Sequence, residues 1–255
     1  MYRIILLNVL LLSLGGRLFG QYHFPMDFAQ SDSTTISRDL ERFSGQMGVH
    51  FGHMPGVVFR LTRAFPRFQF FYQQGAAWTG SNTRYWSADE PAITTAGTFT
   101  GMADLTPNLQ LMVRYNPMMI DGDLAVLNGF GARYRSGVGS DTLHTLAIGV
   151  LVQKLDGAHI LKSNDLDFSL QYSRYYQSWV TSLDLTVSFV RGQMSDTRAA
   201  EFGSEFSGAF EHRVFHLGIK AMRSWNRINT GIAFRTNGRI WNCIAELGWS
   251  LPSSM

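Results

Sequence analysis

The stretch Ser178–Arg191, SWVTSLDLTVSFVR, decides how the rest of the chain is interpreted. Its alternate residues from Trp179 to Phe189 are mainly apolar, and the residues between them are mostly polar. A period of two residues indicates a β-strand, because successive side chains point to opposite faces. Strands of soluble domains average about five or six residues, whereas a tilted strand needs about nine to eleven residues to cross a bilayer. The stretch therefore predicts a transmembrane β-strand.

The same alternation recurs along most of the chain after residue 44 and gives thirteen candidate strands. They cover residues 46–51, 57–62, 67–73, 92–101, 108–115, 123–135, 142–153, 165–173, 178–191, 202–211, 215–221, 228–235 and 240–251. The Thr-rich segment 92–101 is the weakest of them, and 57–75 is alternatively one long bent strand. Because membrane barrels usually have an even number of strands, we expect an all-β, antiparallel up-and-down barrel of about twelve strands.

The links between these candidate strands tend to alternate in length. Short links are expected near 102–106, 136–140, 176–177, 212–213 and 237–238, and longer links near 76–91, 154–164 and 192–200. Short turns at one end and long loops at the other are typical of outer-membrane barrels. An error of one strand would reverse the two ends, so the pattern assigns no loop to a side.

The segments outside the expected barrel (residues 44–251) have other signatures. Residues 1–20 predict a signal peptide, with Arg3 before the apolar run Ile4–Leu14 and small residues before a cut ahead of Gln21. The alternative is an uncleaved N-terminal anchor, although the run is short for a membrane helix. Residues 21–43 predict a lead-in with no strand pattern, and 33–43 a short helix. Residues 252–255 form a short tail.

Charge and cysteine content exclude two classes of protein. The formal net charge is +3 over 255 residues, and two of the positive charges lie in the predicted signal peptide. We therefore expect no nucleic-acid partner. Cys243 is the single cysteine, so the chain has no internal disulfide and its stability must come from the strand network. It lies on the apolar face of the last predicted strand, where a small hydrophobic residue is expected.

The chain resembles Gram-negative outer-membrane β-barrel proteins in its long strands, in the aromatic residues that recur near the strand ends and in its export signal. The resemblance covers the chain from about residue 44 and implies an outer-membrane location and contact with lipid. It also implies assembly by the barrel assembly machinery, which reads a C-terminal strand ending in an aromatic residue. Ile240–Leu251 is similar to such a strand, but Pro252–Met255 follows it and departs from the usual ending.

The alternation also assigns side chains to the two faces of the predicted barrel wall. The candidates for the lumen are Arg114, Arg133, Arg135, Asp184, Glu205, Lys220, Arg235 and Glu246. The candidates for the lipid-facing side are Leu183, Leu185, Val187, Phe189, Trp241, Leu247 and Trp249. In a barrel of about twelve strands, the charged residues either form salt-bridged layers that close the lumen or line a narrow pore.

We expect no catalytic residue, cofactor or metal ion. Ser140, Asp141 and His144 are close in sequence, but no G-x-S-x-G motif is present, and closeness in sequence is not the geometry of a catalytic triad. The acidic segments 121–123 and 164–167 lack the calcium-binding loop of twelve residues with its closing Glu. They predict solvated turns.

Three functions fit these observations. The first is a narrow channel or small-solute transporter of the outer membrane. The second is a structural or scaffold barrel whose loops bind another envelope protein. The third is a secreted soluble β-sandwich or lipocalin-like binder, because alternation alone does not tell the inner face of a barrel from its outer face.

Overall fold

The computed structural model describes residues 20–22, 67–79, 92–94, 97–120, 123–138, 141–159, 161–196, 206–238 and 240–251. Its strands are β1 (Gly20–Tyr22), β2 (Arg67–Thr79), β3 (Ala92–Thr94), β4 (Thr98–Asp104), β5 (Leu109–Ile120), β6 (Asp123–Val138), β7 (Asp141–Asp156), β8 (Leu161–Tyr176), β9 (Trp179–Asp196), β10 (Phe206–Trp225), β11 (Ile228–Thr236) and β12 (Ile240–Leu251). No helix in these ranges is long and apolar enough to cross a membrane.

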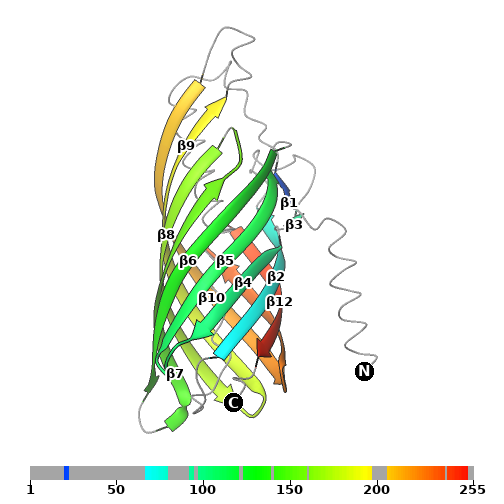
Figure 1. Cartoon of the computed structure of the whole chain (residues 1–255), viewed down its shortest axis with the longest axis vertical. Helices are drawn as coiled ribbons and strands as arrows, with labels where there is room; N and C mark the ends of the chain where they lie inside the picture. Colours follow the sequence, from blue (N-terminus) through cyan, green and yellow to red (C-terminus); the bar gives the residue numbers. More distant parts are fainter. Residues whose placement is uncertain are drawn as a thin grey trace, which may run out of the picture.

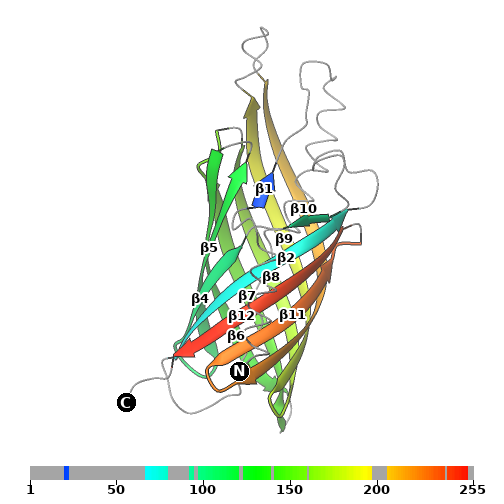
Figure 2. The ribbon, with the colours of Figure 1, turned by 90° about the vertical axis from the view of Figure 1, so that its right-hand side faces the viewer.

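The sheet has twelve strands, and ten of them close into a barrel (Figures 1 and 2). Each strand from β4 to β12 pairs antiparallel with the next, and β2 closes the ring by pairing with both β12 and β4. The three-residue strands β1 and β3 lie outside this ring. β1 pairs with the C-terminal end of β5, and β3 pairs with the C-terminal part of β2. The predicted all-β antiparallel barrel is therefore confirmed.

The pairing register fixes how far the strands lean. If the paired residues are followed from Phe71 through β4 to β9, they lead to His212 on β10. If they are followed from Phe71 through β12 and β11 instead, they lead to Ser224, which is twelve residues further along β10. A shift of this size over ten strands corresponds to a tilt of roughly 40°, within the usual range for barrels. Ten strands make a narrow barrel, because about eight already enclose just enough room for side chains.

The strand order also sorts the connections between the two ends. The lower end in Figure 1 carries the C-terminal end of β12 and the turns 105–108, 177–178 and 226–227. The upper end carries the C-terminal ends of β2, β5, β7, β9 and β11. Gln177 and Asn226, with φ of 50° and 53°, take the left-handed conformation that tight two-residue hairpins require.

Two predicted breaks in the strand pattern are wrong. The break expected at 212–213 lies inside β10, where His212 pairs with Val190 and Arg213 with Phe189. The long link expected over 154–164 is short, because β7 runs to Asp156 and β8 starts at Leu161. In both places the outward face changes from apolar to polar while the strand continues, and this change had the appearance of a loop.

Smaller differences concern the N-terminal half. Residues 20–22 form β1, although the sequence predicts no strand from residue 21 onward. This strand pairs in parallel with Met118–Ile120 of β5, beyond the point where the pairing of β4 with β5 ends at Phe99 and Tyr115. The weak candidate 92–101 is divided into β3 and β4. The predicted signal peptide up to residue 19, the helix over 33–43, the strands 46–51 and 57–62, and the tail 252–255 lie outside the described residues.

Candidate functional site

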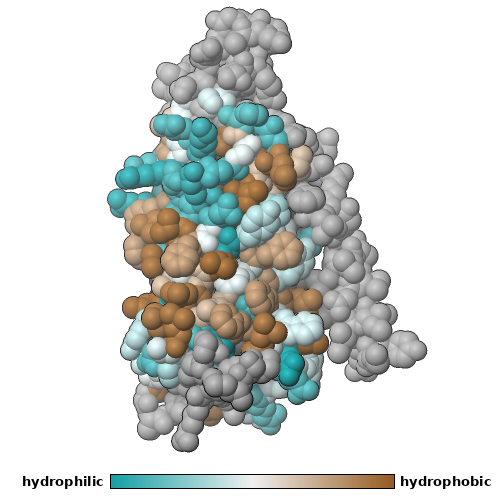
Figure 3. Space-filling model, in the orientation of Figure 1, coloured by the Kyte–Doolittle hydropathy of each residue, from teal (hydrophilic) through white to brown (hydrophobic). Residues whose placement is uncertain are grey.

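The outer wall of the barrel is apolar. Every barrel strand contributes at least one large, exposed apolar side chain. Examples from the ten strands are Phe70, Phe99, Val113, Phe130, Ile148, Phe168, Leu185, Ile219, Ile232 and Trp249. Figure 3 shows a broad band of apolar residues across the wall that faces the viewer. A soluble barrel has the opposite arrangement, with polar residues outside, so this wall fits hydrocarbon rather than water.

The residues assigned to lipid from the sequence lie on this outer wall. Leu183, Leu185, Trp241 and Trp249 are exposed, and the other three are partly exposed on the same face of β9 or β12: Val187, Phe189 and Leu247. Cys243 is partly exposed on the outer face of β12 and is a free thiol.

The lower border of the apolar band is aromatic. Tyr176 and Trp179 face each other across the 177–178 turn, and Trp225 ends β10 next to them. The guanidinium of Arg223 lies 5.4 Å from the ring centre of Trp179 and 4.8 Å from that of Trp225. Aromatic rings with a cationic partner at a strand end are typical of the boundary between hydrocarbon and headgroups.

The residues assigned to the lumen lie on the inner wall. Six of the eight are buried there: Arg114, Arg133, Arg135, Lys220, Arg235 and Glu246. Asp184 is half-buried on the inner face of β9, and Glu205 lies outside the described residues. The two faces thus carry opposite chemistry along the same strands, as in β8, where burial alternates without a break from Leu161 to Tyr176.

A buried ion pair joins four neighbouring strands near the lower end of the lumen. The carboxylate of Asp104 lies 3.2 Å from Arg135 Nη2 and accepts hydrogen bonds from Gln110 Nε2 at 2.7 Å and Gln69 Nε2 at 3.3 Å. Arg135 Nε also donates to the carbonyl of Pro107 in the 105–108 turn, at 2.8 Å. These contacts hold β2, β4, β5 and β6 together where the β4–β5 hairpin turns.

Two further groups of polar contacts each link three strands on the inner wall. Lys220 Nζ on β10 lies 2.6 Å from Glu246 Oε1 on β12, and Gln73 Nε2 on β2 donates to the same oxygen at 2.6 Å. On the opposite side, Gln153 Oε1 accepts from Arg114 Nη1 at 2.9 Å, while Gln153 Nε2 donates to Asp167 Oδ2 at 2.8 Å. The interior is therefore lined by hydrogen-bonded charges from all around the ring.

An apolar cluster interrupts this polar lining. Five buried side chains from β2, β4, β5, β7 and β10 contact one another inside the barrel: Phe71, Met102, Met112, Leu151 and Met222. Because β2 and β7 lie on opposite sides of the ring, the cluster spans the lumen. We call it the lumen cluster.

Several of the interior residues were missed or misplaced by sequence reasoning. Asp165 and Asp167 belong to the inner face of β8, not to a solvated turn. His216 is fully buried on the inner face of β10. The period-two alternation placed each of these residues on the face opposite to the apolar residues, so the signal was present. Among the described residues, no group of three or more His, Cys, Asp or Glu could hold a metal ion.

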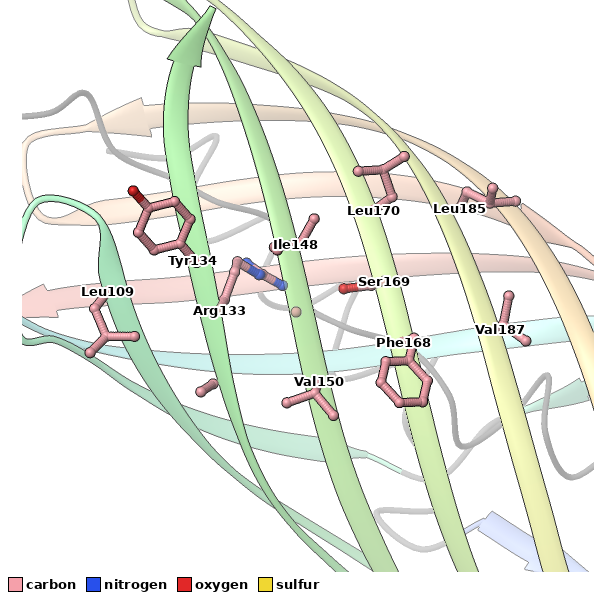
Figure 4. A pocket seen from close by; sticks show the side chains of 12 residues that line it. Leu109, Arg133, Tyr134, Ile148, Val150, Phe168, Ser169, Leu170, Leu185 and Val187 are labelled. Carbon is pink, nitrogen blue, oxygen red and sulfur yellow. The ribbon is translucent and has the colours of Figure 1, made fainter.

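The outer wall also has a shallow hollow of about 550 Å³, shown in Figure 4. Its rim carries large side chains from five neighbouring strands, β5 to β9: Leu109, Tyr134, Ile148, Phe168 and Leu185. Because it opens on the apolar wall, its shape and chemistry suit a lipid acyl chain better than a water-soluble ligand.

A closed sheet leaves no edge with unpaired backbone groups in hydrocarbon, and an apolar exterior suits contact with lipid. The fold and the facing of its side chains therefore define a transmembrane β-barrel of the outer-membrane type.

Comparisons with known proteins agree with this architecture but do not define a family. No family model matches the sequence, and a comparison with curated proteins gives no match. Among solved structures, the outer membrane protease OmpT from Escherichia coli has 8% identity and a TM-score of 0.42, with 73% of this chain and 96% of that chain covered. The KdgM porin in complex with disordered oligogalacturonate has 9% identity and a TM-score of 0.38, with 72% and 99% covered. At these values no residue role passes from those proteins to this chain.

Proposed function

We propose that the barrel is a narrow channel for small polar solutes, closed by the lumen cluster in the conformation described above. The observation that carries the proposal is the charged and polar lining of the inner wall on either side of the lumen cluster. Burying a polar amide oxygen without a partner costs about 1–3 kcal/mol. Asn116 Oδ1, Gln171 Oε1 and Asn242 Oδ1 are such atoms, without a hydrogen bond from the described residues, and water entering the lumen would satisfy them.

The lumen cluster supplies the closed state of this channel. An apolar constriction stops ions and polar solutes because water leaves a narrow apolar passage. Three of its five members are methionines, whose unbranched side chains repack easily. Solute passage then requires these side chains to move aside. The paired strands that carry them can stay in place, because only side chains need to move.

Truncating the lumen cluster tests the channel. The double variant Phe71→Ala/Met112→Ala removes two side chains of the cluster and should raise conductance in planar bilayers well above that of the wild-type barrel. The matched control is Phe70→Ala/Val113→Ala, one residue away on the same two strands, where both side chains are exposed on the outer wall. This control should conduct like the wild type, because its truncations face lipid.

The second candidate function is a structural barrel that binds another envelope protein through its loops. The lumen cluster favours it, since side chains that fill the lumen also serve a barrel that never opens. If the lumen variant folds, shows a heat-dependent gel shift and still conducts no more than the control, the channel proposal fails and the structural function is preferred. In both proposals the barrel has no catalytic role.

A further inference from the structure

On the neighbouring strands β7 to β10, the outer wall changes from apolar to charged at the upper border of the apolar band. Val152 on β7 and Phe215 on β10 are exposed residues of the band. The next outward residue above Val152 is Lys154, and the next above Phe215 is Arg213. Figure 3 shows a region of polar residues above the apolar band on the side of β8 and β9.

Four exposed basic side chains make up what we call the upper basic patch: Lys154, Lys162, Arg191 and Arg213. Strand pairing brings them together. Asn164 on β8 pairs with Lys154 on one side and with Arg191 on the other. Lys162 lies two residues above Asn164 on the same face, and Arg213 pairs with Phe189, two residues below Arg191. The patch therefore covers four adjacent strands directly above the apolar band.

The patch keeps a positive excess after its acidic neighbours are counted. Lys154 Nζ lies 2.8 Å from Asp156 Oδ1, and Arg191 Nη2 lies 2.9 Å from Glu211 Oε1. Four basic side chains against these two acidic ones leave two positive charges in excess. All four paired side chains are more than half exposed, and exposed pairs contribute little, so they exchange partners readily.

One member of the patch is also positioned by the apolar band itself. The guanidinium of Arg213 lies 5.3 Å from the ring centre of Phe189, at the edge of the band. This contact holds a cation at the level where lipid headgroups begin. The lower border differs, since there Arg223 is stacked between two tryptophans.

We propose that the upper basic patch binds the phosphate groups of lipids that surround this end of the barrel. Arginine and lysine are the side chains that proteins use for phosphate, and basic residues next to a bilayer attract anionic headgroups. The acyl chains of the same lipid would lie against the apolar wall below the patch, which a free phosphate cannot do. The inference rests on the position of the barrel in a membrane and is independent of whether the lumen conducts.

Lipid titration of the full-length protein in neutral detergent tests this site. The probes are lipid A with its two phosphates and the same lipid with both phosphates removed, and the readout is lipid binding by native mass spectrometry. The wild type should bind the phosphorylated lipid more tightly. The variant Lys154→Gln/Lys162→Gln/Arg191→Gln/Arg213→Gln should lose roughly tenfold in affinity for the phosphorylated lipid and should no longer distinguish the two.

The control is Arg174→Gln/Arg223→Gln, which removes two outward-facing arginines near the lower border and should leave binding unchanged. Equal binding of the two lipids by the wild type, or full binding by the variant with four changes, would overturn the proposal. Displacement of the lipid by inorganic phosphate alone would indicate a site for the free anion and would also overturn it. If the variant with four changes does not fold, Lys162→Gln/Arg213→Gln, which keeps both ion pairs, should show a smaller loss of the same kind.

Discussion

Asp104→Ala should destabilise the barrel by about 3–5 kcal/mol, because it leaves the buried guanidinium of Arg135 without its counter-charge. Both side chains of this pair are almost fully buried. The change also removes the acceptor for two glutamine side chains from β2 and β5. Urea titration of the folded barrel in lipid vesicles, followed by the gel shift between boiled and unboiled samples, measures the loss.

Asp156→Ala is the matched control for this prediction. Asp156 makes an ion pair of similar length with Lys154, but both side chains are more than half exposed. An exposed pair contributes at most about 1 kcal/mol, so the control should unfold close to the wild-type urea concentration. Equal losses for the two alanine variants would show that the lower lumen is open to water and that the Asp104–Arg135 pair is screened like a surface pair.

Leu185→Arg should cost about 2–4 kcal/mol, which is the effect of a cation near the middle of the lipid-facing wall of a barrel. Leu185 is exposed on β9, and its pairing partners Leu170 and Leu217 on the two neighbouring strands are also exposed. The new charge would therefore be surrounded by apolar side chains and acyl chains. The same urea titration in vesicles measures the difference.

Asp184→Asn tests which face of β9 points to the lumen. Asp184 is adjacent to Leu185 in sequence and is half-buried on the inner wall. The amide has nearly the same size as the carboxylate and can still accept hydrogen bonds, so we expect a mild effect. If the two variants of β9 lose the same stability, or Asp184→Asn loses more, then the assignment of β9 faces to lipid and lumen is wrong.

The sequence was sufficient for the class of fold, because the two faces of a membrane strand meet different solvents and the alternation records this difference. It also assigned the charged residues to one face and the apolar residues to the other. It could not give the partners of these residues. Asp104 and Arg135 are close only because β4, β5 and β6 are paired in a particular register, and no local pattern specifies that register.

Strand boundaries were predicted less well, for a reason that the structure makes clear. The alternation was interpreted as apolar outside and polar inside, which holds only within the apolar band. Above the band the pattern inverts: on β9, Val190 faces inward and is fully buried while Arg191 faces outward and is exposed. The strands continue through this inversion, so the change of polarity near 154–164 and 212–213 was mistaken for loops.

The sequence by itself thus determined that the chain consists of long strands with one apolar and one polar face, because period-two alternation is a local property of each strand. The structure showed that the apolar face is the outer one. Only the tertiary structure decided which strands close the ring, which connections share an end, and that Phe71, Met102, Met112, Leu151 and Met222 meet inside the lumen. These features depend on ring closure and register, which are set by contacts between residues far apart in the chain.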